Sequence, residues 1–523
     1  EVDVQFRRAW AADTTPRGKD VHWWSNPGSW SCEGGAYWFD GLVRLAFQLD
    51  DPALKALASN RLETVLSKMH PNAIGFAWWL DRRDPQQVQE ARSWEMFHLW
   101  IPGIAERALE TWYRATGDRR AAEALGIALD RHAVSYGKFT SLPSAVFAAY
   151  DVTGDSRQAE AMDDFVAALM KPDKLARVFR QYLKPPKEWM SETLAIKRKH
   201  QAVMDMIPRH GVNASETLLT VFRAYQWTGD KEFLKAVRGW YGFFDRHVRQ
   251  PYGVSTMDEE WGYPGPGRGT ETCVVAAESW TRIALMAGLG EGAWGDDVER
   301  AFFNAGQNCA TKDWRLNVYI QTPNRTSANP VQDCSFTGNG DDRIGAYAVK
   351  HSPLCCTAAQ NRIVPNYIQS MWMPLREGGV AATLYGPCAV SLKTKDGVFA
   401  ADEETRYPYG EEIVIRVKAA PEKEMPLKLR VPGWCAAPSV AVNGEAVAEK
   451  PVKGFVTVRR AWRADDVVVV RLPMAVRVEK MTSYNDRSKG WLSLSRGPLL
   501  YAHVVPGTDV NTPVEPVYVP EAP

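Results

Sequence analysis

Apolar residues recur at helical spacing over the first two thirds of the chain, and a short motif interrupts them. Three copies of Thr-Gly-Asp end at Asp118, Asp155 and Asp230, so the second interval is about twice the first. The stretch LAFQLDDPAL at 45–54 is an earlier, degenerate copy. Each copy lies between two amphipathic stretches. The pattern therefore predicts two helices joined by a Gly-centred turn, with the Asp or Thr capping the second helix.

A helical hairpin that recurs about every 37 residues over roughly 350 residues predicts a helical array. Such an array is either an open solenoid or a closed ring. The aromatic-rich helices and their irregular inserts favour the closed ring, an (α/α)6 toroid whose mouth forms a pocket.

The pattern changes near residue 376, where short β-branched runs separated by Gly, Pro and Asn begin. The Asn-Gly pair at 443–444 suits a tight hairpin turn. A chain of 523 residues is also too long for one core. We therefore expect a multi-domain α plus β protein, with an (α/α)6-barrel catalytic domain over 1–375 and a β-sandwich region over 376–523.

The formal net charge is only +1. Nucleic acids and anionic membranes attract proteins with a strong basic excess, so neither is expected as a partner. No apolar run reaches the roughly 20 residues that span a bilayer. Residues 1–20 are charged and do not resemble a secretion signal. The start without Met favours a periplasmic or secreted bacterial protein over a cytoplasmic one.

Tryptophan is unusually frequent, with 21 residues, and it clusters at 22–30, 76–83 and 93–100. One interpretation is that these indole rings fill helix interfaces. The other is that their flat faces stack on sugar rings, which makes a glycan a candidate ligand.

Two of the eight cysteines, Cys355 and Cys356, are adjacent. Adjacent cysteines rarely bond to each other because the ring is strained, so they are either small buried residues or ligands. Glu271 and Cys273 offer a carboxylate and a third thiol. Thiolates suit zinc, and a carboxylate can complete a four-coordinate site. The other cysteines fit best as core or loop residues: Cys32, Cys309, Cys334, Cys388 and Cys435.

Several motifs resemble glycoside hydrolase family 127, a former domain of unknown function whose founding members are β-L-arabinofuranosidases. They are GTETC after DEE…P, LCCTAAQN followed by Arg362, HGVN at 210–213 and YIQTPN at 319–324. The resemblance extends to 37–56 and 429–445 and so covers nearly the whole chain. It implies a retaining enzyme with an (α/α)6 barrel and β-sandwich modules.

The resemblance also implies roles for the site residues. Zinc would be held by one carboxylate and three thiolates: Glu271, Cys273, Cys355 and Cys356. Cys355 would be the nucleophile, kept deprotonated by the metal. The acid/base glutamate falls at Glu259 when the DEE…P…GTE pattern is aligned. It falls at Glu260 when a glutamate before an aromatic-Gly pair is aligned, and we prefer Glu259.

Five further residues are candidate sugar contacts: His210, His98, Gln321, Asn324 and His351. A tie between helix ends is the alternative for His210, and polar bonding in the core is the alternative for Gln321 and Asn324. His98 is offset by one residue from its family position. His351 lies four residues before the cysteine pair, where the founding members have a histidine two before, and this departure bears on substrate preference.

The expected function is a retaining exo-glycosidase that removes a terminal furanose-like sugar, by default β-L-arabinofuranose, from plant or algal glycans. Aceric acid and 3,6-anhydrogalactose units are alternative sugars. Two other classes stay open: a toroid lyase or epimerase with structural zinc, and a non-catalytic glycan-binding protein. The β-sandwich is expected either to pack on the barrel or to mediate a dimer.

Overall fold

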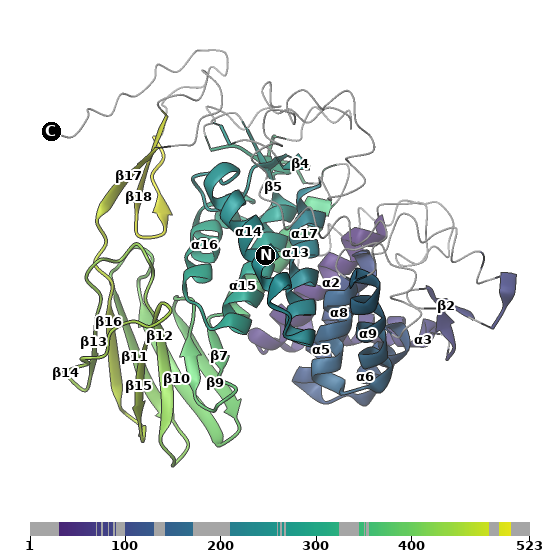
Figure 1. Ribbon diagram of the computed structural model, residues 1–523, viewed down its shortest axis with the longest axis horizontal. Helices are drawn as coiled ribbons and strands as arrows, with labels where there is room; N and C mark the ends of the chain where they lie inside the picture. The colour runs from purple at the N-terminus through teal and green to yellow at the C-terminus, as the bar shows by residue number, and fades with distance from the viewer. Residues whose placement is uncertain are drawn as a thin grey trace.

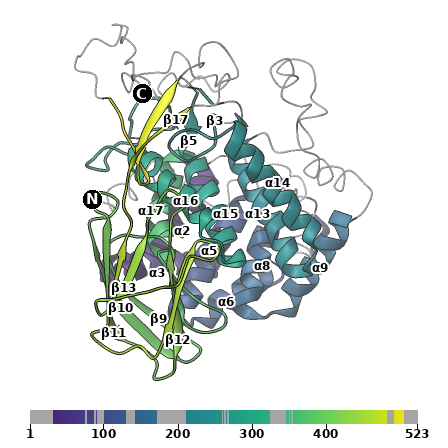
Figure 2. The same ribbon diagram turned by 60° about the vertical axis from the view of Figure 1, so that its left-hand side comes forward.

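The computed structural model is shown in two views in Figures 1 and 2. It describes residues 31–69, 71–74, 77–81, 83–86, 89, 100–129, 142–170, 210–258, 260–261, 264–265, 268–323, 345–349, 351, 355–480 and 491–503. Three residues that the sequence suggests for the site, His98, Glu259 and Asn324, lie outside these ranges. The same is true of the tryptophan side chains in the three Trp-rich stretches.

The helices form a closed double ring. The inner helices are α2 (Ser31–Gln48), α5 (Trp100–Thr116), α8 (Leu142–Thr153), α13 (Gly211–Thr228), α15 (Thr272–Leu289) and α17 (Cys355–Gln369). Each packs on the next, and α17 packs back on α2. Behind the first five lie α3 (Pro52–Lys68), α6 (Arg119–Ala128), α9 (Ser156–Met170), α14 (Lys231–His247) and α16 (Ala293–Ala301). The expected toroid is therefore confirmed. Among the described helices, none has the length and apolarity needed to cross a membrane.

The Thr-Gly-Asp motifs form the turns between inner and outer helices. Their glycines have φ values of 72°, 64° and 73°, a left-handed region that glycine enters without steric cost: Gly117, Gly154 and Gly229. The following Asp caps the outer helix, as Asp230 does by accepting the Glu232 N–H at 2.9 Å. In the degenerate copy Asp50 takes the glycine position with φ 52°, and Asp51 is the cap. All these turns follow inner helices, so they lie at one end of the ring.

Beyond α17 the chain forms strands, listed here with their bounds: β7 (Trp372–Pro374), β8 (Val380–Ala382), β9 (Cys388–Thr394), β10 (Gly397–Thr405), β11 (Glu412–Ala419), β12 (Met425–Arg430), β13 (Ser439–Val442), β14 (Glu445–Ala446), β15 (Phe455–Arg460) and β16 (Val467–Arg471). They make a six-stranded sheet, β14-β13-β16-β11-β10-β9, and a four-stranded sheet, β15-β12-β8-β7. Alternate residues such as Ile413 and Ile415 of β11 share one core with Leu427 and Leu429 of β12, so the two sheets form a sandwich.

A third sheet, β17 (Val476–Lys480), β18 (Leu492–Arg496) and β19 (Leu499–Leu500), follows. The Asn443–Gly444 pair turns between β13 and β14 with φ values of 53° and 85°, as expected for a type I′ hairpin. Since the helices give way to strands just after α17, we propose residue 376 as the domain boundary.

A buried ion cluster joins the sandwich to α16. Arg430, at the end of β12, is fully buried and pairs with Asp296 at 2.5 Å and with Glu299. The Tyr385 N–H donates to Glu299 at 3.0 Å. Buried charges are tolerated only when they are paired, so these contacts hold the sandwich against the ring in one orientation.

Candidate metal centre

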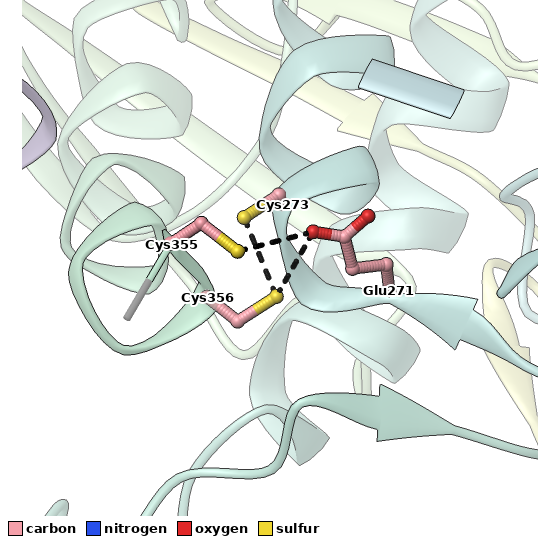
Figure 3. Close-up of side chains that lie close together, drawn as sticks. All are labelled: Glu271, Cys273, Cys355 and Cys356. Atoms are coloured by element: carbon pink, nitrogen blue, oxygen red, sulfur yellow. Dashed lines mark hydrogen bonds between the residues drawn. The ribbon is translucent and has the colours of Figure 1, made fainter. Parts of the chain in front are cut away.

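The four predicted ligands lie together at the N-terminal ends of two inner helices (Figure 3). Glu271 ends β5 (Thr270–Glu271) and precedes α15, and Cys273 is the second residue of that helix. Cys355 and Cys356 open α17. The four ligand atoms lie within 4.8 Å of one another, and all four side chains are buried. Three thiols and one carboxylate at such separations can hold a metal ion.

The cluster is held together by sulfur contacts. The Sγ atoms of Cys355 and Cys356 lie 3.5 and 3.3 Å from Oε1 of Glu271. The Sγ atoms of Cys273 and Cys356 are 3.3 Å apart, well beyond a disulfide bond, and all three thiols are free. One carboxylate oxygen thus contacts two thiols, as expected for groups that converge on a common point.

Short strands fix the carboxylate side of the cluster. Backbone pairing joins β5 to β6 (Ile320–Gln321) on one side and to β3 (Met257–Asp258) on the other. The Thr272 N–H donates to the carbonyl of Tyr319 at 2.9 Å. The same Tyr319 places its buried hydroxyl 3.3 Å from the Sγ of Cys355. This residue opens the YIQTPN motif but was not predicted as part of the site, because the sequence alone does not separate its phenol from that of a core tyrosine.

The three thiols differ in their electrostatics. Burial alone would raise the pKa of Cys355, but hydrogen bonds with Cys273, Cys356 and Tyr319 bring it well below its usual range. Burial, followed by the neighbouring thiols, raises the pKa of Cys273, and burial also raises that of Cys356. The N-terminal ends of α15 and α17 add positive potential, which favours a thiolate. Both effects favour the thiolate form of Cys355.

His210 lies at the edge of the cluster. It precedes α13, and its Nε2 lies 3.6 Å from Oε2 of Glu271 while the side chain stays 29% exposed. The next residue explains the placement. A Cβ on Gly211 would lie 2.5 Å from the Met257 sulfur and 2.8 Å from Val274, so only glycine lets α13 approach β3 and α15 this closely.

Gln321 and His351 lie near the cluster but bond to the backbone. Gln321 Nε2 donates to the carbonyl of Ala305 at 2.9 Å. His351 is buried, with Nε2 2.9 Å from the carbonyl oxygen of Asn317. Its ring lies edge-on to Tyr319 with 6.0 Å between centroids. These contacts support the strand segment that carries Tyr319.

The segment with the candidate acid/base residues adjoins the cluster. Strand β4 (Glu260–Trp261) pairs with β3, with Asp258 opposite Glu260, and Met257 of β3 pairs with Thr270, the residue before Glu271. The buried carboxylate of Asp258 accepts a hydrogen bond from Arg268 at 2.7 Å. One strand, β3, therefore separates Glu260 from β5, the strand that carries Glu271.

Comparison with known proteins supports the sequence resemblance. Residues 379–474 match the model of the GH127 middle domain, described as β-L-arabinofuranosidase. This match bears out the recognition of glycoside hydrolase family 127 in the β region, and the matched family is of the enzyme class that the sequence predicts. No curated protein matches significantly.

Solved structures with a similar fold include a GH127 β-L-arabinofuranosidase from Geobacillus stearothermophilus T6. It is 20% identical, with a TM-score of 0.70, and the match covers 95% of this chain and 80% of that one. A GH127 β-arabinofuranosidase has a TM-score of 0.65 at 17% identity over 95% of this chain and 79% of its own. At these identities the likeness is one of fold, and it confirms the predicted class of helical toroid followed by a β domain.

Proposed function

We propose, taking the relationship to glycoside hydrolase family 127 as the premise, that this chain is a retaining exo-glycosidase with a cysteine nucleophile. It would release a terminal furanose-like sugar from a glycan. The observation that carries the proposal is the convergence of Glu271, Cys273, Cys355 and Cys356, buried and unbridged, where the inner helices α15 and α17 begin. Retaining glycosidases more often use two carboxylates, so a thiol cluster in this place calls for another nucleophile.

Zinc is the metal we propose, with those four residues as its ligands. The donor set fits, because thiolates suit zinc and the groups would make a four-coordinate site. Buried thiols grouped this tightly are otherwise hard to ionise together. Bound zinc would keep the thiolates deprotonated near neutral pH, where a free thiol is largely protonated.

The reaction would proceed in two balanced steps. The Cys355 sulfur attacks the anomeric carbon, a C–S bond forms, and the glycosidic C–O bond breaks as the leaving oxygen takes a proton from a glutamic acid. The resulting glutamate then removes a proton from water. The water oxygen attacks the same carbon, the C–S bond breaks, and the Cys355 thiolate is restored. Two inversions give net retention of configuration.

The acid/base residue in this scheme is Glu259, with Glu260 as the alternative. Support comes from the strand pairing that sets this segment beside β5. The Asp258–Arg268 ion pair, 2.7 Å long, also fixes this segment. Tyr319 would hold the Cys355 sulfur in place by hydrogen bonding. His210, beside Glu271, is our candidate for a contact with a sugar hydroxyl.

The sugar we propose is β-L-arabinofuranose, because the matching family and a structurally similar enzyme are described as β-L-arabinofuranosidases. The terminal sugar would stack on aromatic side chains, for which the Trp-rich stretches of the sequence are the candidates.

Metal content is the first test. Elemental analysis of the wild type should give about one zinc per chain, and Cys356→Ala should lose it. Cys309→Ala is the matched control, since Cys309 is also buried but bonds to the Gly306 carbonyl away from the cluster. Zinc-free wild type, or equal loss in the control, would refute the site.

Activity on an aryl β-L-arabinofuranoside separates the remaining roles. Cys355→Ser should abolish turnover. If Cys355→Ser keeps zinc and still converts a glycan, giving unsaturated or epimerised products, a lyase or epimerase with structural metal is favoured instead. Glu259→Gln should lower turnover of substrates with poor leaving groups by roughly 10²–10⁴-fold, the usual worth of acid catalysis. The same loss in Glu260→Gln alone would transfer the role to Glu260.

A further inference from the structure

Helices α2 and α17 approach each other unusually closely at one point. A Cβ built on Gly41 of α2 would lie 2.6 Å from the carbonyl oxygen and 2.9 Å from the carbonyl carbon of Asn361 in α17. Atoms of the backbone cannot yield as the end of a flexible side chain can. Any larger residue at position 41 must therefore push α17 away from α2.

The carbonyl that meets Gly41 is set free by a proline. Pro365 lies inside α17 and has no N–H, so the Asn361 carbonyl, four residues before it, cannot make its regular helical hydrogen bond. Carbonyls released in this way tilt out of the helix. Gly41 supplies a Cα–H surface against which such a carbonyl can pack. The missing side chain of Gly41 thus makes room for the carbonyl that the missing N–H of Pro365 leaves without its helical donor.

Other side-chain contacts also join α2 to α17. The Gln48 amide donates to the Pro365 carbonyl at 2.8 Å. The Arg362 guanidinium lies 3.8 Å from the centroid of the Tyr37 ring, and both side chains are fully buried. Since α17 opens with Cys355 and Cys356, the position of the thiol pair depends on how α2 holds this helix.

We propose that Gly41 is a positioning residue for the metal centre, although it touches none of the ligands. Half of the ligand set comes from α17 and half from α15 and the strand before it. Metal sites tolerate only a few tenths of an ångström in ligand distance. Moving a carbonyl from 2.6 Å to an ordinary contact above 3.4 Å requires more than that, so displacing α17 spoils the ligand geometry. The inference rests on the proposed metal site.

The experiment compares zinc affinity, measured by competition with a chromophoric chelator, in four proteins: wild type, Gly41→Ala, Pro365→Ala and the double variant. Gly41→Ala should bind zinc about 10- to 100-fold more weakly, the loss typical when the support of a metal ligand is removed. In the Pro365→Ala background the Asn361 carbonyl regains a helical donor, so Gly41→Ala should cost clearly less there. Gly239→Ala is the matched control, because a Cβ there meets nothing within 4 Å.

The cobalt(II) form adds a readout that a loss of fold would not imitate. The thiolate charge-transfer bands should shift in Gly41→Ala while far-UV circular dichroism stays unchanged. Unaltered zinc affinity and bands in a folded Gly41→Ala would overturn the positioning role. An equal loss in both backgrounds would overturn the coupling of Gly41 to Pro365. Wild type that binds no zinc would instead defeat the proposed function, so the two failures are distinguishable.

Discussion

Glu403 of β10 is a buried carboxyl that we expect to make the stability of the sandwich depend on pH. Burial is the main cause that raises its pKa from 4.5 to about 8, and the charge of Glu299 adds to it. Hydrogen bonds from the Gly386 N–H at 3.0 Å and the Trp372 indole N–H at 2.9 Å oppose the shift only in part.

The sign follows from proton release. The folded protein keeps this proton up to about pH 8, whereas the unfolded chain loses it near pH 4.5. Between these values unfolding releases a proton, so the contribution of Glu403 is full below pH 4.5 and is lost as the pH rises to about 8. The slope is about 1.4 kcal/mol per pH unit, and the whole window amounts to roughly 5 kcal/mol.

Glu403→Gln isolates this effect, since the amide is uncharged at every pH. Denaturant unfolding of both proteins at pH 5.5, 7 and 8.5 should show wild type losing stability relative to the variant as the pH rises. The amide must also turn its NH2 group toward one of the two donors, which costs about 1–3 kcal/mol at all pH values. The slope of the difference is therefore the readout, and parallel profiles would refute the reasoning.

Two further predictions concern the frame of the molecule. Arg430→Met leaves Asp296 and Glu299 without their buried partner and should lower the free energy of unfolding by about 3–5 kcal/mol in denaturant titrations. An effect below 1 kcal/mol would mean that water reaches the junction. Asp230→Ala removes the cap that accepts the Glu232 N–H and should cost about 1 kcal/mol, seen as a lower melting temperature with kcat unchanged.

The repeat could be predicted because each turn is determined locally. The glycine with positive φ and the Asp that caps the next helix stand within three residues of each other, so the turn is visible in the sequence. The apolar spacing on either side then predicts the two helices. The β region was predictable for the same reason, from alternation and from the Asn443–Gly444 turn. Outside the three Trp-rich stretches, Trp38 and Trp240 are buried in the helical core.

The site was predictable only through its resemblance to a family. The two halves of the cluster, Glu271 with Cys273 and Cys355 with Cys356, are more than 80 positions apart. No local pattern indicates that Cys273 and Cys356 lie in contact. Tyr319 was missed since a phenol becomes informative only when its neighbour is known. Gly41 and Pro365 were missed because close helix packing depends on how two distant segments are oriented.

The two ends of the helical ring carry different features: turns at one end, and the residues of the candidate site at the other. Short Gly-centred turns follow the inner helices, whereas segments such as 130–141 and 171–209 lead into them. All inner helices thus begin at the same end, where α13 brings His210, α15 brings Cys273 and α17 brings the thiol pair. Their dipoles point positive potential at that end, which favours thiolates. Changes in the turns should therefore alter stability, and changes at the helix starts should alter chemistry.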